Sequence, residues 1–524
     1  MPRKAALRAS GAIDEPNLIL PLATSINERG VAGYTHSVSN SEDQRKINCF
    51  YDFAKNSLTA KGTLTLSKRP GVTIGSGTYG TSAQTAYLVL NTLRGAEIAH
   101  AVFYLVSGDA KVSSESAMAT ILSPATNLYP SFVDITAISN VQNAVLQLTG
   151  TGTHRVFFAT MANVVTGGAW TEIVDADFTT LGHRGKMEHM DGFAFILTDQ
   201  NLIVNSDTNS LANWTANAFL AKQIRQDRPI GLMRLGNQLI ACGDETSEIF
   251  FNNGNTTGSP LGRLAHLHSR IGLVPTVGVI STTTARGGTH YYATVEKRLY
   301  FVGRRSGGGS QSVSAAGLSP SVGVFAYDGQ NFEKVSNQYV DKILSEKYNS
   351  IYAVSPLGFS GVSGVSICLT APGVSPARWL VFFPDWREWF EWTSTVFSPI
   401  NSGEQYLGLG SLQHKLYSFA GTDKWQDDTT SYACSTQFRL PTNGSSLKFM
   451  PMYGVDADTD STTNDLTIEI STDDSQTFST LGTIPLNQDR KVLFGGGSFR
   501  KAHIRLSNTN ARPVRIHNWL ARIE

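Results

Sequence analysis

The sequence predicts an all-β protein: a β-propeller with an additional β-sandwich-like domain and long loops. Charged residues make up only 16% of the 524-residue chain, against about a quarter in an average globular protein. The chain also holds 48 Gly, 26 Phe and 17 Tyr, a mixture that favours strands joined by tight turns. Its apolar runs are short and bounded by Gly, Asn, Asp or Pro, whereas sustained helical periodicity is nearly absent.

Seven of these runs are the clearest expected strands. They are residues 102–106, 155–159, 192–197, 238–242, 298–302, 379–383 and 415–419. The best helix candidate is Tyr339 to Tyr348, in which Val340, Ile343 and Leu344 lie on one side.

Several runs share one shape, a turn followed by an apolar strand and a polar turn. Examples are "DGFAFILTDQNLIVN" (191–205), "GNQLIACGDETSEIFF" (236–251) and "EKRLYFVGRR" (296–305). Some intervals between such runs fit the 40–45 residues that a four-stranded propeller blade needs. We therefore expect about six irregular blades, with insertions near 108–150 and 303–321. Antiparallel hairpins in stacked sandwiches remain the alternative.

Three regions follow from this pattern. Residues 1–70 form an N-terminal arm and platform-like segment, 71–425 the propeller, and 426–524 a C-terminal β-sandwich-like domain with longer alternating strands. The loop Gly303 to Ser321 is rich in Gly and Ser. It is either a surface insertion or a segment that reaches a channel or a neighbouring subunit, and Arg304 and Arg305 at its base favour contact with DNA or an acidic partner.

The charge balance, the most apolar window and the cysteines argue against a nucleic-acid-binding, a membrane-spanning and a disulfide-rich protein. Lys plus Arg (43) nearly balances Asp plus Glu (42), which does not favour wholesale electrostatic binding of nucleic acid. The most apolar window, 86–106, contains Asn91, Arg94, Glu97 and His100, so we expect no membrane-spanning segment. The cysteines (Cys49, Cys242, Cys368 and Cys434) form no CxxC pair; we expect buried free thiols, made in a reducing compartment.

Three motifs resemble ligand sites without completing them. Gly75 to Gly80 matches GxGxxG, but no helix is expected after it to bind a pyrophosphate. Asp456, Asp458 and Asp460 resemble the start of a calcium loop, yet the glycine and the final acid of that loop are missing. His266 and His268 share one face of an expected strand and lack a third zinc ligand. The sequence therefore predicts no cofactor and no metal.

Two other motifs bear on carbohydrate chemistry. Ser471 to Phe478 resembles the Asp-box hairpin, S-x-D-x-G-x-T-W, with Ser475 at the glycine position. That hairpin occurs in sialidase propellers, although its Asp has a structural role. Trp386, Trp389 and Trp392, with neighbouring Phe382, Phe383 and Phe390, form the densest aromatic cluster. We interpret it as sheet core, with carbohydrate stacking as the alternative.

No nucleophile, zinc or phosphate-loop motif and no paired carboxylates stand out. The sequence therefore predicts no catalytic residue, and that the protein is not an enzyme.

Several segments spread over most of the chain share features with one family of proteins. In residues 48–72, "NCFYDFAKNSLTAKGTLTLSKRPGV", an Asn-x-Tyr-type stretch is followed by an x-Arg-Pro-Gly turn. The other segments are "LIACGDETSEIFFNNGN" (239–255), "SRIGLVPTVGVI" (269–280), "EKRLYFVGRR" (296–305) with "VFAYDG" (324–329), and the closing "SFRKAHIRLSNTNARPVRIHNWLARIE" (498–524). Together these segments resemble the tail hub, or nozzle, proteins of short-tailed bacteriophages, also called packaged-DNA stabilisation or head-completion proteins.

The resemblance implies a virion structural protein. Such a protein forms a homohexameric ring below the portal and its adaptor ring, extends the channel through which double-stranded DNA passes, helps to retain packaged DNA, and docks tail fibres, spikes or a needle. Its place would be the virion tail, after synthesis in the host cytoplasm. Two alternatives remain: a propeller glycosidase acting on host surface polysaccharide, and a cellular propeller for protein binding.

Overall fold

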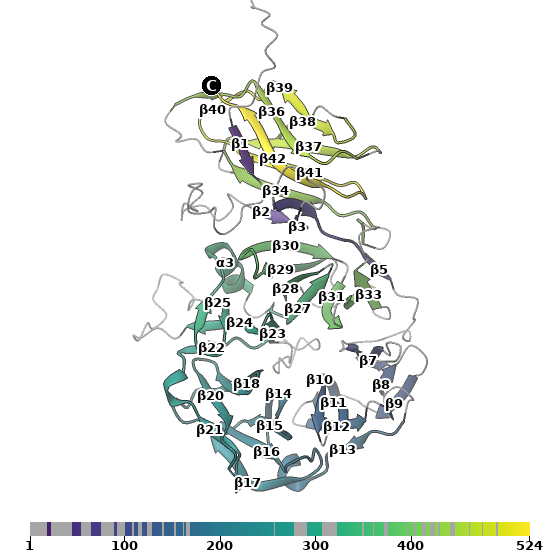
Figure 1. Ribbon diagram of the computed structural model, residues 1–524, viewed down its shortest axis with the longest axis vertical. Helices are drawn as coiled ribbons and strands as arrows, with labels where there is room; N and C mark the ends of the chain where they lie inside the picture. Colours follow the sequence, from purple (N-terminus) through teal and green to yellow (C-terminus); the bar gives the residue numbers. More distant parts are fainter. Residues whose placement is uncertain are drawn as a thin grey trace, which may run out of the picture. The chain divides into compact units, whose positions relative to one another are not determined.

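A computed structural model describes most of the chain as two compact units. One unit comprises residues 1–69 and 430–524, and the other residues 70–429 (Figure 1). The described residues are 18–21, 45–53, 64–74, 89–91, 100–106, 109–113, 118–122, 128–138, 141–150, 154–160, 162–163, 168–255, 257–276, 291–305, 322–347, 350–359, 361–370, 376–394, 396–402, 405–410, 416–419, 425–427, 430–440, 446–460, 462–473, 475–488 and 491–524.

The second unit is a β-propeller, as predicted. Its described residues form seven antiparallel sheets, here called blades 1 to 7. They are β6 (Val89–Asn91), β7 (His100–Val106), β8 (Asp109–Ser113) and β9 (Met118–Leu122); β10 (Leu128–Ile138), β11 (Val141–Gly150), β12 (His154–Thr160) and β13 (Thr171–Glu172); β14 (His183–Met190), β15 (Phe193–Thr198), β16 (Leu202–Ser206) and β17 (Trp214–Ala221); β18 (Pro229–Leu235), β19 (Gln238–Gly243), β20 (Ser247–Asn252) and β21 (Leu261–Arg263); β22 (Ile271–Leu273), β23 (Tyr292–Val295), β24 (Arg298–Arg305), β25 (Val322–Tyr327) and β26 (Phe332–Lys334); β27 (Ala353–Phe359), β28 (Val362–Cys368), β29 (Ala377–Phe383) and β30 (Glu388–Ser394); and β31 (Val396–Ser402), β32 (Gln405–Gly410), β33 (Leu416–Phe419) and β5 (Val72–Ile74).

The blades follow one another around a ring. Neighbouring blades contact each other through their inner strands: β10 contacts β14, β14 contacts β18, β23 contacts β27, β27 contacts β31 and β31 contacts β6 (Figure 1). Blade 4 contacts blade 5 through β18 and β24. Strand β5 comes from the start of the propeller yet pairs with β33 of the last blade, Val72 opposite Phe419 and Ile74 opposite Tyr417. A strand from one end of the unit therefore completes a sheet made at its other end.

The blade count and one insertion differ from the sequence prediction. We expected about six blades and an insertion near 108–150, whereas this stretch contains β8 to β11, which belong to blades 1 and 2. The error arose because strands such as β8 (DAKVS) are short and polar, and so lack the apolar run that marked the other blades. Of the second expected insertion, residues 306–321 lie outside the described residues.

The propeller cores lie between blades. On β19, Leu239 and Ala241 pack against blade 3, whereas Ile240 and Cys242 pack against blade 5. Each of these side chains is 0% exposed. A strand that is buried on both faces reads as a continuous apolar run rather than as an alternating one, which is why these strands were recognisable in the sequence.

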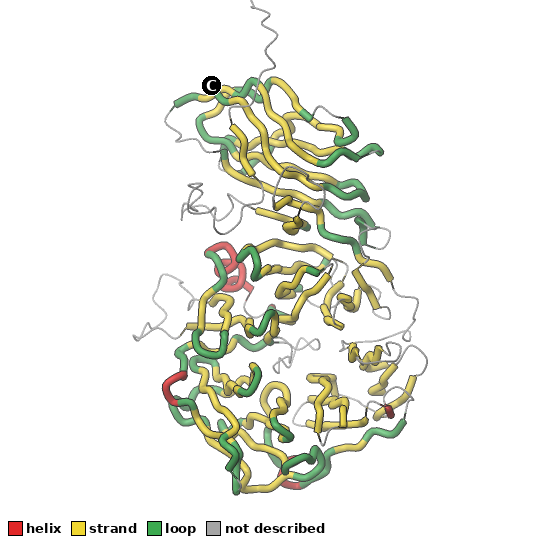
Figure 2. The backbone as a smooth tube through the Cα atoms, viewed as in Figure 1, coloured by secondary structure: helices red, strands yellow, loops and turns green. Residues whose placement is uncertain are grey.

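The other unit is a two-sheet β-sandwich. One sheet has the order β3 (Cys49–Phe53), β4 (Leu64–Lys68), β42 (Arg515–Arg522), β36 (Met452–Ala457) and β39 (Val492–Phe494), and β1 (Leu18–Pro21) also pairs with β42. In the second, β2 (Arg45–Ile47) is followed by β34 (Cys434–Arg439), β41 (His503–Asn508), β37 (Asp465–Ser471) and β38 (Ser479–Pro485). Trp519 of the first sheet packs edge-on against Phe438 of the second, with ring centroids 5.8 Å apart. Strands dominate both units (Figure 2).

The N-terminal segment is part of this sandwich. We expected residues 1–70 and 426–524 as separate regions, but β3 pairs with β4, and β4 pairs with β42 near the C-terminus. The pairing of β4 with β42 cannot be read from local sequence, because the paired residues lie more than 400 positions apart along the chain, as in Leu66 opposite Ile516.

Few described residues are helical. Helix α3 (Gln338–Lys347) covers almost the predicted range, and Val340, Ile343 and Leu344 are buried in the core between blades 5 and 6. No helix in the described part of the chain has the length and apolar character needed to cross a membrane.

Ring closure predicts an intolerance to side chains at Gly71, which precedes β5. A Cβ atom there would lie 2.0 Å from the carbonyl oxygen of Gln426, and backbone atoms cannot yield as a flexible side chain can. We expect Gly71→Ala to lower the free energy of unfolding by about 2 kcal/mol, as overpacking typically does. Urea denaturation followed by circular dichroism measures this change, and an unaltered midpoint would contradict the close approach.

Candidate functional site

A polar cluster on the inner strands of blades 3 to 5 is the most distinctive site of the propeller. It consists of Lys186, Glu188, Tyr291 and Tyr292, and is called the inner-strand cluster below. The Glu188 carboxylate is an ion-pair partner of Lys186 (Nζ to Oε1, 3.0 Å) and accepts a hydrogen bond from the Tyr292 hydroxyl at 2.7 Å. The Lys186 ammonium also lies 4.1 Å from the centroid of the Tyr292 ring, a cation–π geometry.

Glycines bring these inner strands close enough for the cluster to form. Gly185 has a φ of +69°, and a Cβ atom on it would lie 2.6 Å from the Cα of Gly231 on β18. Tyr291 fills the remaining space, donating its hydroxyl to the Leu232 carbonyl at 2.6 Å. Burial raises the pKa of Tyr291 well above its usual value, so it stays a neutral donor.

The cluster is neutral and almost completely buried. Only 3% of the Glu188 side chain and 13% of the Lys186 side chain are exposed. A buried carboxylate is stable only when its charge and its hydrogen bonds are satisfied, and here partners from blades 3 and 5 satisfy it. The cluster therefore links blade 3 to blade 5, and Tyr291 links both to blade 4 through Leu232.

A second buried network joins blades 3 and 4. Lys222, which follows β17, pairs with Asp227 and donates to the Thr246 hydroxyl at 3.0 Å. The backbone N–H of Thr246 donates to Asp227 at 2.8 Å. Burial alone would raise the pKa of Asp227, but the hydrogen bonds and charge of these partners lower it overall. The network is therefore ionised and internally satisfied.

Two carboxyl groups meet where the turns of blades 5 and 6 approach each other. Glu296 lies between β23 and β24, and Asp385 between β29 and β30. Partial burial raises the pKa of Glu296. The negative charge of Asp385 and a hydrogen bond between the two carboxyl groups raise this pKa further, whereas the charge of Arg298 lowers it. Sequence analysis missed this pair because its members are distant in the chain and neither lies in a motif.

The predicted motifs do not converge on one site. Residues 75–80, the GxGxxG segment, lie outside the described residues. Asp456 accepts a hydrogen bond from Asn518, Asp458 pairs with His517 at 2.9 Å, and Asp460 accepts from the backbone of Thr462. No group of three or more His, Cys, Asp or Glu residues that could hold a metal occurs within the ranges that the structure describes.

The two histidines were placed wrongly. His266 and His268 do not share the face of a strand, because the segment forms the 3₁₀ helix η1 (Ala265–Leu267). The His268 ring contacts the Ala265 carbonyl at 2.8 Å, which closes this short turn.

The Asp-box-like segment has the structural role that we expected. Asp473 accepts hydrogen bonds from the Ser471 hydroxyl at 2.6 Å and from the Thr477 backbone at 2.9 Å. These bonds lower its pKa. Ser475 has a φ of +70°, a conformation that favours the glycine found there in the motif.

The aromatic cluster is core, as interpreted. Trp386, Trp389 and Trp392 are at most 8% exposed, and Trp389 donates its indole N–H to the Val335 carbonyl at 3.0 Å. Of the loop expected over 303–321, only Gly303, Arg304 and Arg305 are described, and they belong to β24.

Comparisons with known proteins extend the fold assignment only. No protein-family model and no curated protein sequence matches the chain. Among solved structures, the chain is similar to the β-propeller domain of the Trilobed protease from Pyrococcus furiosus (9% identity, TM-score 0.32, covering 64% of this chain and 96% of that one). It is also similar to exo-β-1,3-galactanase from Phanerochaete chrysosporium (10% identity, TM-score 0.26, covering 91% of this chain and 96% of that one). A third similar structure is a glycoside hydrolase family 43 arabinoxylan arabinofuranohydrolase from Bacillus subtilis (10% identity, TM-score 0.24, covering 92% of this chain and 96% of that one).

The prediction that the protein is not an enzyme is corrected. Solved structures that resemble this fold include glycoside hydrolases. The absence of a catalytic motif could not exclude an enzyme of this class, because the two carboxyl groups of a glycosidase converge in space and leave no fixed spacing in the sequence.

Loss of the Tyr292 hydroxyl from the inner-strand cluster is expected to lower the free energy of unfolding. Tyr292→Phe removes the hydrogen bond to Glu188 but keeps the ring beneath Lys186, so we expect a loss of about 2 kcal/mol, typical for a hydrogen bond to a buried charge. Urea denaturation measures it, with Tyr352→Phe as the control, expected within about 0.5 kcal/mol of the wild type. Equal effects of the two substitutions would contradict the structural role of the cluster.

His183 on β14 predicts a pH dependence of stability. Its ring is 4% exposed and stacks on His154, and its Nε2 lies 3.2 Å from the Phe178 carbonyl. Burial, followed by the charge of His154, lowers the pKa of His183 from 6.5 to about 4. Because the folded state binds this proton less readily than the unfolded state, the stabilisation is complete above pH 6.5 and is lost as the pH falls towards 4.

We therefore expect the free energy of unfolding to fall by about 2 kcal/mol between pH 7 and pH 5 through this one group. Urea titrations at each pH measure the fall, and His183→Gln serves as the matched variant because it cannot titrate. An identical slope in both proteins would assign the effect to other groups.

Proposed function

We propose that this protein is a subunit of the tail hub, or nozzle, of a short-tailed bacteriophage. The observation that carries the proposal is the contact between the two halves of the N-terminal motif that the family shares. The Asn-x-Tyr-type stretch begins at Asn48, and the x-Arg-Pro-Gly turn contains Arg69, twenty-one positions later. The two residues meet in the core of the sandwich unit.

The contact is buried and specific. The Arg69 guanidinium is 0% exposed and stacks on Tyr432 at 3.8 Å. Its Nε donates to the Asn48 side-chain carbonyl at 3.2 Å, and its backbone N–H donates to the Asn48 backbone carbonyl at 2.9 Å. Asn48 itself has a φ of +55°, which asparagine tolerates better than most residues. Arg and Asn therefore have a physical reason to occur together in this motif.

The motif also stands at the point where the chain enters the propeller. Arg69 ends the first segment of the sandwich unit, and Gly71 and β5 follow within the propeller. A hub subunit needs one part that forms ring contacts and another that carries attachments. The chain has two such parts, because the propeller is inserted between the two segments that form the sandwich unit. This organisation supports separate roles in ring contacts and in attachment.

The proposal includes the assembly. Six copies would form a closed ring beneath the adaptor ring in the virion tail, extend the channel for double-stranded DNA, help to retain packaged DNA and dock fibres, spikes or a needle. The nearly balanced charge, 43 basic against 42 acidic residues, supports a channel protein, because a strongly basic wall would retain DNA through counterion release.

A second candidate function is hydrolysis of host surface polysaccharide. The observation that favours it is the raised pKa of Glu296, which burial and the neighbouring Asp385 cause, since a glycosidase needs one carboxyl group that stays protonated to act as general acid. This function and a role in the tail are compatible within one protein.

Mass photometry and electron microscopy of the purified full-length chain test the hub proposal. Six copies of the 56.7 kDa chain give a particle of about 340 kDa with sixfold symmetry, and obligate contacts of about 2,000 Å² or more are expected between subunits. A protein that stays monomeric, alone and with a portal–adaptor complex, would contradict the proposal.

Incubation with host polysaccharides tests the second candidate separately. Release of reducing sugar that is lost in both Glu296→Gln and Asp385→Asn, but kept in the exposed-residue control Glu333→Gln, would establish hydrolysis. Activity retained in both variants would exclude this carboxyl pair as its source.

A further inference from the structure

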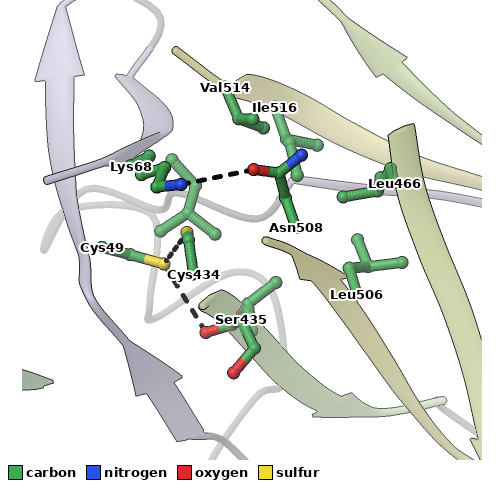
Figure 3. A pocket seen from close by; sticks show the side chains of 11 residues that line it. Cys49, Lys68, Cys434, Ser435, Leu466, Leu506, Asn508, Val514 and Ile516 are labelled. Carbon is green, nitrogen blue, oxygen red and sulfur yellow. Dashed lines mark hydrogen bonds between the residues drawn. The ribbon is translucent and has the colours of Figure 1, made fainter. Parts of the chain in front are cut away.

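Two of the four cysteines face each other in the sandwich unit. The Sγ atoms of Cys49 on β3 and Cys434 on β34 lie 2.8 Å apart (Figure 3), only slightly farther than the length of a disulfide bond, about 2.05 Å. The other two cysteines lie singly in the propeller: the Cys242 Sγ accepts from the Ser247 hydroxyl at 3.5 Å, and the Cys368 Sγ is 3.6 Å from the Thr370 carbonyl.

The backbone holds the two thiols in this position. On one side, Ile47 of β2 is paired with Ser435 of β34. On the other, the side-chain amide of Asn48 donates to the Ala433 carbonyl at 2.7 Å. Both neighbours of Cys434, Ala433 and Ser435, are therefore held against the segment that leads into Cys49 by contacts that do not involve sulfur.

A small cavity borders the thiols. Its volume is about 10 Å³, and its walls include both cysteines, Lys68 and Asn508 (Figure 3). That is close to the least space that accepts one water molecule, so the cavity does not hold an oxidant, and a small peroxide would reach the pair at Cys434, which is 8% exposed.

Charge near the pair favours its reaction. Lys68 is the cross-strand partner of Cys49 and is 0% exposed. Burial and the neighbouring Cys434 raise the pKa of the Cys49 thiol well above its usual value, and Lys46 and Lys68 oppose this only in part. Cys49 therefore stays protonated until it attacks its oxidised partner, and the ammonium groups favour the loss of its proton at that step.

We propose that Cys49 and Cys434 are a disulfide-forming pair whose oxidant is hydrogen peroxide. Cys434, 8% exposed against 0% for Cys49, reacts first. Its thiolate attacks one peroxide oxygen, the O–O bond breaks, and the second oxygen leaves as water after protonation. The Cys49 sulfur then attacks the resulting sulfenic acid, loses its proton and releases the hydroxyl as a second water. Two thiols and one peroxide thus give one disulfide and two waters.

The bond would join the two segments of the sandwich unit. The cysteines are 385 residues apart, and the whole propeller lies between them in the chain. A cross-link over so long a loop removes much freedom from the unfolded chain. The oxidised sandwich is therefore expected to unfold at a higher denaturant concentration than the reduced one, whatever the protein does in a virion.

Peptide mapping of the full-length chain tests the proposal. The folded protein is treated with hydrogen peroxide, denatured in the presence of N-ethylmaleimide and digested without reductant. We expect a linked Cys49–Cys434 peptide as the main form of both residues, reversible by dithiothreitol. Cys242 and Cys368 are also buried and serve as internal controls that stay alkylated.

A second readout separates the bond from peroxide damage. Trp519 is the only tryptophan of the sandwich unit, so ¹⁹F NMR of protein labelled with 5-fluorotryptophan reports its unfolding in urea. Oxidation should raise this midpoint in the wild type and leave it unchanged in Cys434→Ser. The proposal is overturned if Cys434 accumulates as sulfinic acid while Cys49 remains a thiol, or if cross-links to Cys242 or Cys368 are as abundant.

Discussion

Closure of the propeller ring is the constraint on which the rest of this structure depends. The last blade is completed by β5, which the chain contributes before any blade has been made. Because the chain enters and leaves the propeller beside this closing strand, as the close approach of Gly71 and Gln426 shows, the segments before and after it share one unit. The composite sandwich of residues 1–69 and 430–524 follows from that path.

Within the ring, apolar packing and buried polar groups have different tasks. Alternate side chains of strands such as β19 fill the cores on both sides, but apolar contacts alone tolerate small slips between neighbouring sheets. The Lys222–Asp227 pair and the inner-strand cluster tolerate no such slip, since a displaced partner would leave a charge buried and unsatisfied. The polar contacts therefore fix how one blade sits against the next.

The sequence predicted local features well and distant ones poorly. Strand identity and helix α3 followed from side chains buried on known faces, which leave a pattern over a few residues. The polar strand β8 left no such pattern, and the pairing of Leu66 with Ile516 left none at all. The meeting of Glu296 with Asp385 depends on how two blades align, which no spacing along the chain encodes.

The origin of β5 also sets the order in which the protein can be completed during synthesis. Blades 1 to 6 draw on neighbouring stretches of chain and can form as the ribosome delivers them, N-terminal parts first. Blade 7 must wait until β33 has emerged, and β3 and β4 must wait still longer for β42, the last strand of the chain. Until then the nascent protein carries unpaired strand edges, which are templates for association with other chains. A ribosome that stalls before residue 515 therefore releases a product more prone to aggregate than its nearly complete length suggests.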